Sequence, residues 1–177
     1  DVGAAVPAAF AHSAVQAAIR PGMRVALTGG SRGIDRIDQV LRAAVAEMRK
    51  LGAEPFVVPA MGSHGGATAA GQLAVLAEYG VTEEALGCPI RASMETDLLG
   101  YVEDQPVAGG TARVPVWFDA TAHRSADVVI PVGRVKPHTD FHGVIESGLM
   151  KMVAIVLGKQ KGADTFHSYG FPEFPTL

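Results

Sequence analysis

The chain has 177 residues, of which 48% are hydrophobic and 19% charged, a balance typical of an ordered globular protein. Its formal net charge of −3 gives no electrostatic reason to expect nucleic acid or an anionic membrane as a partner. The single cysteine, Cys88, excludes an intrachain disulfide and favours a reducing, cytoplasmic compartment. No apolar run has the length of a membrane span, and the N-terminus lacks the pattern of a secretory signal.

The first predicted elements alternate between strand and helix. The segment "MRVALTGG" predicts a strand that ends in a glycine turn. The following segment, "IDRIDQVLRAAVAEMRKLG", has apolar residues at helical spacing and ends at Gly52, a typical helix stop. The segment "EPFVVPAMG" predicts a second strand, so the three segments indicate a βαβ unit with parallel strands and a right-handed crossover.

Further elements follow the same alternation. The loop "SHGGAT" precedes a helix in "AAGQLAVLAEYG" with Thr68 as its N-cap, and "VTEEALG" predicts a short helical turn. The segments "LLGYVEDQPV" and "GTARVPVWF" predict a hairpin on a sheet edge, because their prolines disfavour a central strand. The segment "DATAHRSA" predicts a short helix, "DVVIPVGRVK" a strand covered on both faces, and residues 146–157 the last helix. Together these elements predict a three-layer α/β domain with a mostly parallel sheet flanked by helices.

Three predicted strands are each followed by an unusual loop, "TGGSRGID", "MGSHGGAT" and "VKPHTDFHG". Ligands bind at the carboxyl ends of parallel strands, so these loops should share one rim. In the first, Arg32 suits a carboxylate or phosphate, although a surface arginine that closes a turn has the same pattern. The loop lacks the G-x-G-x-x-G spacing of dinucleotide sites, so NAD binding has poor support. In the second, His64 lies between glycines before a helix, which predicts either an anion site or a flexible turn.

The third loop contains His138, Asp140 and His142, an H-x-D-x-H cluster that could bind zinc. A solvated polar loop is the alternative, since no Cys-x-x-Cys motif supports a metal site. The cluster predicts, as one alternative function, a zinc-dependent hydrolase. A non-catalytic α/β module that binds a phosphorylated ligand in the loop around His64 is another.

Lys151 lies in the apolar run "IESGLMKMVAIVLG", which predicts a buried helix. Its ammonium group either extends along the helix to solvent or faces a closed site. In a closed site, desolvation lowers the pKa of the amine and leaves a nucleophile for a covalent bond to a cofactor or substrate. Composition alone leaves both alternatives open.

The segments "SHGGAT", "KPHTDF", "ESGLMKM" and the late "FH" occur in an order and spacing that resembles the N-terminal domain of the nickel-pincer lactate racemase family over nearly the whole chain. The resemblance implies that Lys151 is covalently attached to a nickel-pincer nucleotide, a pyridinium dithio mononucleotide with nickel. It implies that His167 is the protein ligand of the nickel. It also implies that His64 and His138 are the acid/base histidines and that Arg32 holds the substrate carboxylate.

The activity that the resemblance implies is an isomerase activity, the racemisation or epimerisation of a 2-hydroxy acid. One histidine takes the hydroxyl proton while a hydride leaves Cα for the cofactor, and the planar ketone then accepts the hydride on its other face. Imidazole alternates between base and acid near neutral pH. The resemblance further implies cofactor-biosynthesis proteins as partners. It implies that residues 1–177 form a single α/β cofactor-binding domain that ends before a C-terminal domain. The resemblance is also compatible with an oligomeric protein.

Two motifs differ from those of the family's lactate enzyme. Its arginine motif is D-x-x-R-P, whereas here Gly29 and Gly33 stand at the aspartate and proline positions. Its histidine motif is G-x-H-R-P, whereas here His64 is followed by Gly65 and Gly66. Both differences lie on the substrate side of the implied site, so the resemblance leaves the identity of the 2-hydroxy acid open.

Overall fold

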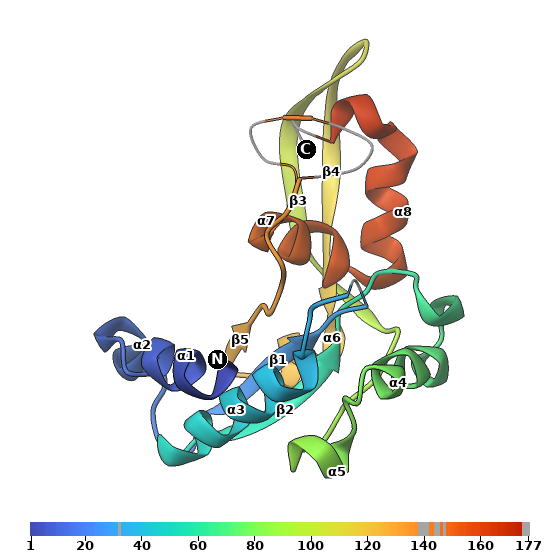
Figure 1. Ribbon diagram of the computed structural model, residues 1–177. Coiled ribbons are helices and arrows are strands. Elements are labelled where there is room, and N and C mark those ends of the chain that lie inside the picture. The colour runs from blue at the N-terminus through green and yellow to red at the C-terminus, as the bar shows by residue number, and fades with distance from the viewer. Residues whose placement is uncertain (32, 138–141, 144–145, 147, 175–177) are drawn as a thin grey trace.

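The computed structural model describes residues 1–31, 33–137, 142, 143, 146 and 148–174, and Figure 1 shows the arrangement of its elements. Within these residues, no helix combines the length and apolar character needed to cross a lipid bilayer. In chain order the elements are α1 (Val2–Phe10), α2 (Ser13–Ala18), β1 (Arg24–Gly29), α3 (Ile37–Lys50), β2 (Glu54–Pro59), the 3-10 helix η1 (Gly65–Ala67), α4 (Ala69–Glu78), α5 (Glu83–Leu86), β3 (Thr96–Val107), β4 (Gly110–Asp119), α6 (Ala120–Ser125), β5 (Val128–Ile130), α7 (Leu149–Lys151), the π-helix η2 (Met152–Val156), α8 (Lys159–Tyr169) and the 3-10 helix η3 (Phe171–Glu173).

A three-stranded parallel sheet in the order β2–β1–β5 lies at the centre of the fold. β1 pairs with β2 over its whole length, from Arg24 opposite Glu54 to Gly29 opposite Pro59, and with the shorter β5 on its other side. The predicted βαβ unit is confirmed, with α3 as the crossover between β1 and β2. The predicted α/β fold class, a parallel sheet flanked by helices, is confirmed as well.

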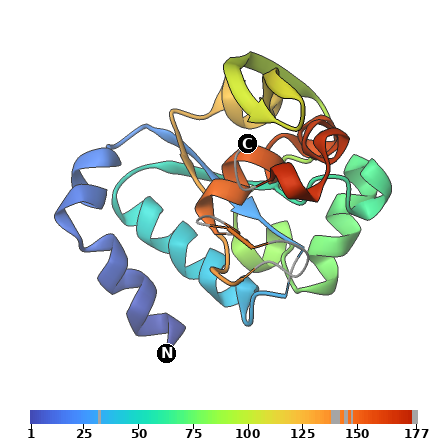
Figure 2. The same cartoon turned by 90° about the horizontal axis from the view of Figure 1, so that it is seen from above.

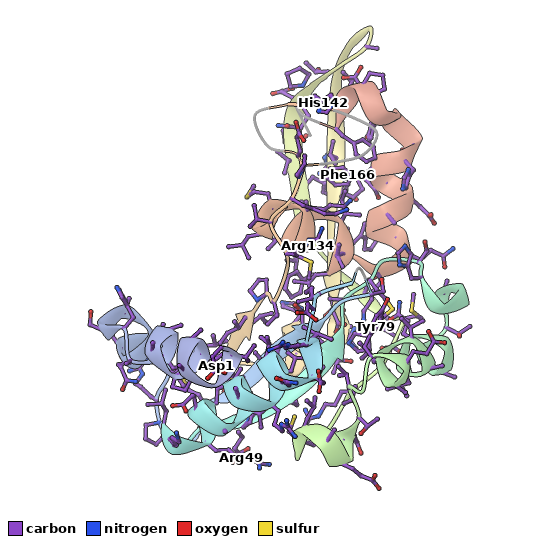
Figure 3. The ribbon with its side chains drawn as sticks, viewed as in Figure 1. Asp1, Arg49, Tyr79, Arg134, His142 and Phe166 are labelled. Atoms are coloured by element: carbon purple, nitrogen blue, oxygen red, sulfur yellow. The ribbon has the colours of Figure 1, made fainter. Side chains whose placement is uncertain are left out.

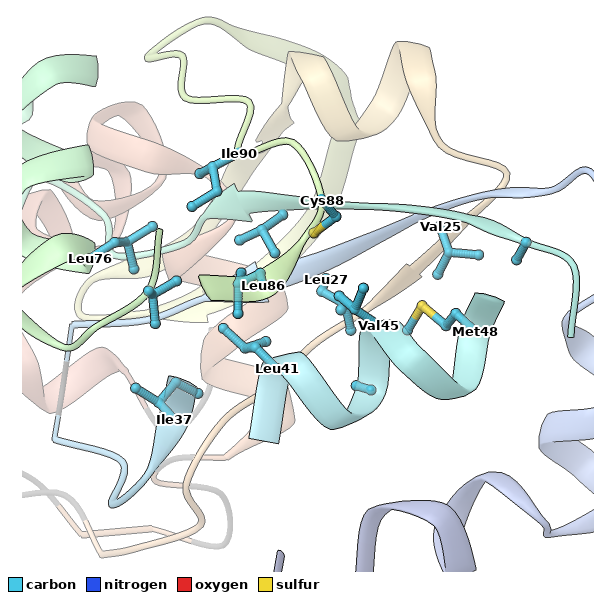
Figure 4. Close-up of a cluster of buried hydrophobic side chains, with 14 of the residues drawn as sticks. Val25, Leu27, Ile37, Leu41, Val45, Met48, Leu76, Leu86, Cys88 and Ile90 are labelled. Carbon is cyan, nitrogen blue, oxygen red and sulfur yellow. The ribbon is translucent and has the colours of Figure 1, made fainter. Parts of the chain in front are cut away.

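Alternate residues of the central strand enter two separate cores. Val25 and Leu27 pack with α3, whose Leu41 and other buried side chains face them in Figure 4. Ala26 points to the other face, where it packs with a cluster that includes Leu157. Both faces of the sheet are therefore covered, which explains why its strands are nearly continuous apolar runs.

The shorter helices lie where the sequence predicts them. At the start of α4, the N–H of Gly71 donates to Oγ1 of Thr68 at 3.0 Å, which confirms the predicted N-cap. The predicted helical turn in "VTEEALG" is α5, and the predicted helix in "DATAHRSA" is α6. Oδ1 of Asp119 accepts from the N–H of Ala122 at 2.8 Å and caps α6 in the same way.

β3 and β4 pair antiparallel in a separate two-stranded sheet, as Figure 1 shows. The predicted hairpin is confirmed, but the expectation that it lies on an edge of the parallel sheet is wrong. The hairpin forms a sheet of its own, and α8 packs against β4. Its register shifts between Leu98 and Gly100 and again between Val102 and Gln105.

The C-terminal part of the fold differs most from the prediction. The run expected to be one buried helix over residues 146–157 contains α7 and η2, in which Leu149, Met150 and Val153 are 58%, 57% and 44% exposed. The prediction of a buried helix is therefore wrong: the run packs on one side, and Lys151 is half-buried. A further helix, α8, follows and carries His167.

Two glycines bring α8 back against η2. A Cβ atom at Gly158 would lie 2.7 Å from Cα of Gly162, and one at Gly162 would lie 2.9 Å from the carbonyl oxygen of Ile155. A side chain at Gly158 would therefore clash with the first turns of α8, and one at Gly162 would force α8 away from η2. This close approach lets η2 and α8 contribute to the same wall of the site.

Candidate functional site

The segments that follow β1, β2 and β5 meet at the carboxyl edge of the parallel sheet, where they line a cavity of about 240 Å³. The prediction that the three loops share one rim is confirmed for their described residues. The lining residues from these segments are Gly30, Ser31 and Ile34 after β1, Ala60, Met61, Gly62, Ser63 and His64 after β2, and Val132, Gly133, Arg134 and Lys136 after β5.

The remaining lining comes from the C-terminal helices. Lys151 of α7 and His167 of α8 contribute polar groups, and Met152, Ile155 and Val156 of η2 contribute apolar ones. In Figure 3, Arg134 is labelled between the parallel sheet and the part of the molecule that holds the hairpin and α8. The cavity therefore lies between the parallel sheet and the C-terminal helices.

Three of the five site residues predicted from the resemblance lie at this cavity. His64, Lys151 and His167 reach it from the loop after β2, from α7 and from α8. Arg32 and His138 lie outside the described residues, so their predicted positions and roles stay predictions.

The predicted zinc cluster falls largely outside the described part of the chain. His138 and Asp140 are not described, whereas the side chain of His142 is 85% exposed and its Nδ1 lies 3.3 Å from Oε1 of Glu146. Among the residues that the structure describes, no group of three or more histidine, cysteine or acidic side chains could hold a metal ion. The zinc site stays a prediction.

α4 holds the loop that carries His64. Nε2 of the fully buried Gln72 donates to the carbonyl oxygens of Gly62 at 3.0 Å and of His64 at 3.3 Å. Gly65 has a φ of 69°, and a Cβ atom there would lie 2.5 Å from the carbonyl carbon of Gly71. Only glycine fits so tight a turn, which fixes the backbone of His64 just before η1.

The ring of His64 contacts the first loop. Oγ of Ser31 lies 2.6 Å from Nδ1 of His64, and both residues line the cavity. The hydroxyl of Tyr79 donates to the carbonyl oxygen of Ser31 at 3.1 Å and holds the serine backbone. Ser31 is a site residue that the sequence pattern did not single out. The signal that could have found it is its position two residues after the end of β1, on the same rim as His64.

The segment after β5 is held by contacts with β1 on one side and with η2 on the other. Oγ1 of the buried Thr28 accepts from the N–H of Val132 at 2.8 Å, which extends the contact between β1 and β5 beyond the last paired residue. A Cβ atom at Gly133 would lie 3.1 Å from Cγ of Met152, so this segment also touches η2 closely. In η2 the N–H of Leu157 donates to the carbonyl oxygen of Met152 at 2.9 Å, the wide turn that often occurs at functional sites.

The charged groups in the described lining of the cavity are all cationic. The charged side chains among its described lining residues are Arg134, Lys136 and Lys151, and none of those lining residues is a carboxylate. Nη1 of Arg134 also donates to the carbonyl oxygen of Gly33 at 3.4 Å. Cations that converge on a partly enclosed space attract an anion, so the site suits a ligand with a phosphate or carboxylate group.

The lysine that the fold buries completely is Lys159, not Lys151. Its Nζ lies 2.7 Å from Oδ2 of Asp119 and also donates to the carbonyl oxygen of Pro59. Burial lowers the pKa of Lys159, and the neighbouring carboxylate of Asp119 opposes that shift. These contacts of Lys159 hold the first residue of α8 against the ends of β2 and β4. They therefore affect the site by setting the position of the α8 backbone.

The site therefore combines an amine from Lys151, imidazoles from His64 and His167, and further cations in one cavity. Such an arrangement can bind an anionic ligand, present an amine to it and exchange protons with it. A scan against protein-family models and searches of curated proteins and of solved structures find no match to this chain.

Proposed function

We propose that the chain is the cofactor-bearing α/β domain of a 2-hydroxy-acid racemase or epimerase that uses a lysine-tethered nickel-pincer nucleotide. The observation that carries the proposal is that His64, Lys151 and His167 line one cavity although they come from three separate elements. Those three residues are the ones to which the resemblance assigns the proton transfer, the covalent bond and the metal contact.

The residues at the cavity fit such a group. The amine of Lys151 would form the covalent bond, and the imidazole of His167 would coordinate nickel, which accepts nitrogen ligands readily. The ring of His167 lies 5.5 Å from the ring of Phe174, a contact that restricts its orientation. Arg134 and Lys136 would bind the phosphate of the nucleotide or the carboxylate of the substrate.

The chain's own residues would position the substrate and move protons. The bound cofactor would supply the hydride acceptor that protein side chains lack. His64 would exchange a proton with the hydroxyl group on one face of the substrate, and His138 would do so on the other face. Arg32 and the cations of the cavity would hold the carboxylate in place, so that Cα alone changes configuration.

Production of the chain together with the proteins that make the nickel-pincer nucleotide tests the proposal. We expect the intact mass to increase by the tethered group, with the addition mapped to Lys151 and with stoichiometric nickel. Lys151→Arg keeps the charge but removes the primary amine, so the addition and the nickel should both be lost. Lys161→Arg is the matched control, because Nζ of Lys161 lies 4.3 Å from the ring centroid of Trp117 and the residue does not line the cavity.

A second variant separates the covalent bond from the metal contact. His167→Ala should retain the addition on Lys151, while bound nickel falls by about tenfold or more because a ligand is lost. An unmodified Lys151, under conditions in which an established racemase of the family becomes loaded, would overturn the proposal.

A non-catalytic module for a phosphorylated ligand is the second candidate. The cationic lining of the cavity and the glycine-rich turn after His64 favour it. Its ligand would bind reversibly and leave Lys151 unmodified, so the same mass measurement distinguishes it from the racemase proposal.

A further inference from the structure

The contact between Ser31 and His64 joins the first two loops at the rim of the cavity. Their Oγ and Nδ1 atoms are 2.6 Å apart, a short hydrogen bond. Each partner is held independently, Ser31 by the hydroxyl of Tyr79 and the backbone of His64 by Nε2 of Gln72. The serine is therefore fixed in a position from which it can control the orientation and protonation of the imidazole.

The direction of this hydrogen bond decides which ring nitrogen of His64 carries the proton. A serine hydroxyl can donate to Nδ1 or accept from it. If Ser31 donates, the neutral ring carries its proton on Nε2 and cannot accept another proton there. If Ser31 accepts, Nδ1 carries the proton in the neutral ring and in the imidazolium alike, so Nε2 can gain and lose a proton while the contact stays intact.

We infer that Ser31 is a positioning residue that accepts a hydrogen bond from Nδ1–H of His64, which makes Nε2 the nitrogen that exchanges a proton with a ligand in the cavity. The inference rests on the proposed acid/base role of His64 and adds the residue that sets its tautomer.

The neutral character of serine suits this role. A carboxylate at the same position would stabilise the imidazolium and raise the pKa of the ring, whereas a hydroxyl sets the tautomer without adding a charge. A residue that serves both directions of a racemisation needs both protonation states near neutral pH. The other titratable or cationic groups that line the cavity in the described chain are Arg134 and Lys136 after β5, Lys151 on α7 and His167 on α8.

Nitrogen-15 spectra of the histidine rings in the free chain test the inference without any cofactor. Two histidines outside the cavity calibrate the spectra. Nδ1 of His12 accepts from the N–H of Ala14 at 3.3 Å, which requires the Nε2–H tautomer. Nδ1 of His123 lies 2.7 Å from a carboxylate oxygen of Asp97, which requires a proton on Nδ1. We expect the neutral ring of His64 to resemble His123.

Substitutions at Ser31 make the test specific. Ser31→Ala should abolish the preference of His64 for the Nδ1–H tautomer, and Ser31→Thr, which keeps a hydroxyl group, should retain it. Ser31→Asp should raise the midpoint of the His64 titration by about one pH unit, because the new carboxylate stabilises the imidazolium. The signals of His12 and His123 should be the same in all variants.

An Nε2–H tautomer in wild-type His64, or identical His64 spectra in the wild type and Ser31→Ala, would overturn the inference. Neither result affects the mass addition on Lys151, so failure of the inference is distinguishable from failure of the proposed function.

In loaded protein with racemase activity, Ser31→Ala should lower kcat about ten- to a hundredfold with little change in KM. Ser31→Thr should restore most of the rate, and an equal loss in both variants would contradict the inference.

Discussion

Lys159 and Asp119 form an ion pair from which solvent is excluded. Neither side chain has exposed surface, and the two charged atoms are 2.7 Å apart. Each charged group loses its hydration on burial. Removal of either partner therefore leaves the other charge buried without compensation. Because Lys159 begins α8 and also donates to the carbonyl oxygen of Pro59, the pair sets the position of the helix that carries His167.

Removal of the buried amine should destabilise the fold strongly. We expect Lys159→Met to lower the free energy of unfolding by about 3–5 kcal/mol, because Asp119 is left charged in a dry interior. A second substitution, Asp119→Asn, should recover part of the loss, since asparagine is neutral and keeps the oxygen that caps α6. Urea denaturation measures both values.

The exposed Lys161 provides the matched control for this prediction. Lys161→Met removes a cation that lies over the ring of Trp117 and should lower the free energy of unfolding by no more than about 1 kcal/mol. A double variant of Lys159 and Asp119 that is less stable than Lys159→Met alone would contradict the account of the pair.

The sequence predicts some of these residue positions and cannot predict others. An apolar run around Lys151 indicates burial, but its periodicity does not reveal that Leu149, Met150 and Val153 are exposed in the structure. Lys159 lies in a polar segment, and its burial depends on Asp119 and Pro59, which only the tertiary structure brings near. Ser31 was missed because a serine that follows two glycines is also common in ordinary turns.

Among the elements, the parallel strands are the most predictable. Burial on both faces makes each of them a short apolar run, and the glycines that follow mark where it ends. The hairpin of β3 and β4 was predictable as a local pairing, whereas its separation from the parallel sheet and its contact with α8 are features of the tertiary structure. A local sequence pattern carries no information about such a contact between distant elements.

A cluster of charged side chains joins β3 to α6. Oδ2 of Asp97 accepts from Nε of Arg124 at 3.0 Å and lies 2.7 Å from Nδ1 of His123. The hydrogen bond from Arg124, followed by that from His123, lowers the pKa of Asp97 below its ordinary value of 3.8. At pH values between the pKa of Asp97 in the folded chain and 3.8, the unfolded chain therefore binds more protons than the folded one.

This difference predicts how the cluster contributes to stability at different pH values. Its contribution is fully present above pH 3.8 and is lost as the pH falls through the lower pKa of the folded state. We expect Asp97→Asn to lower the melting temperature at neutral pH, by an amount that shrinks in acid and at high salt. Asp164→Asn, on the exposed side of α8, is the control and should change little. If Asp97→Asn lowered the melting temperature by the same amount at every pH, the stabilising role of the ionised Asp97 carboxylate would be contradicted.

The cavity lies where the parallel sheet meets the C-terminal helices. Figure 1 and Figure 2, which views the molecule from above, show the segment of α7 and η2 over the carboxyl edge of the sheet and beside α8. One wall was predictable, since parallel strands bring their loops to a common edge. The other wall was not, because it depends on the close packing of Gly158 and Gly162 at the start of α8.

Lys151 shares one cavity with His64 and His167, and chemical labelling of the lysine tests this arrangement. Pyridoxal phosphate is an aldehyde with a phosphate group, which condenses with an amine to an imine and water; borohydride then reduces the imine to a stable amine. The cationic lining should direct the reagent to Lys151. Lys136→Arg removes the other lysine among the described lining residues, and peptide mapping identifies the labelled product.

Histidine ring spectra of protein labelled at Lys151 are the decisive measurement. The signals of His64 and His167 should shift, because a ring and a phosphate have been placed in the space that they line, while His12 and His123 stay unchanged. Unshifted signals for both His64 and His167 in fully labelled protein would contradict the shared cavity, and the proposed function would lose the observation on which it rests.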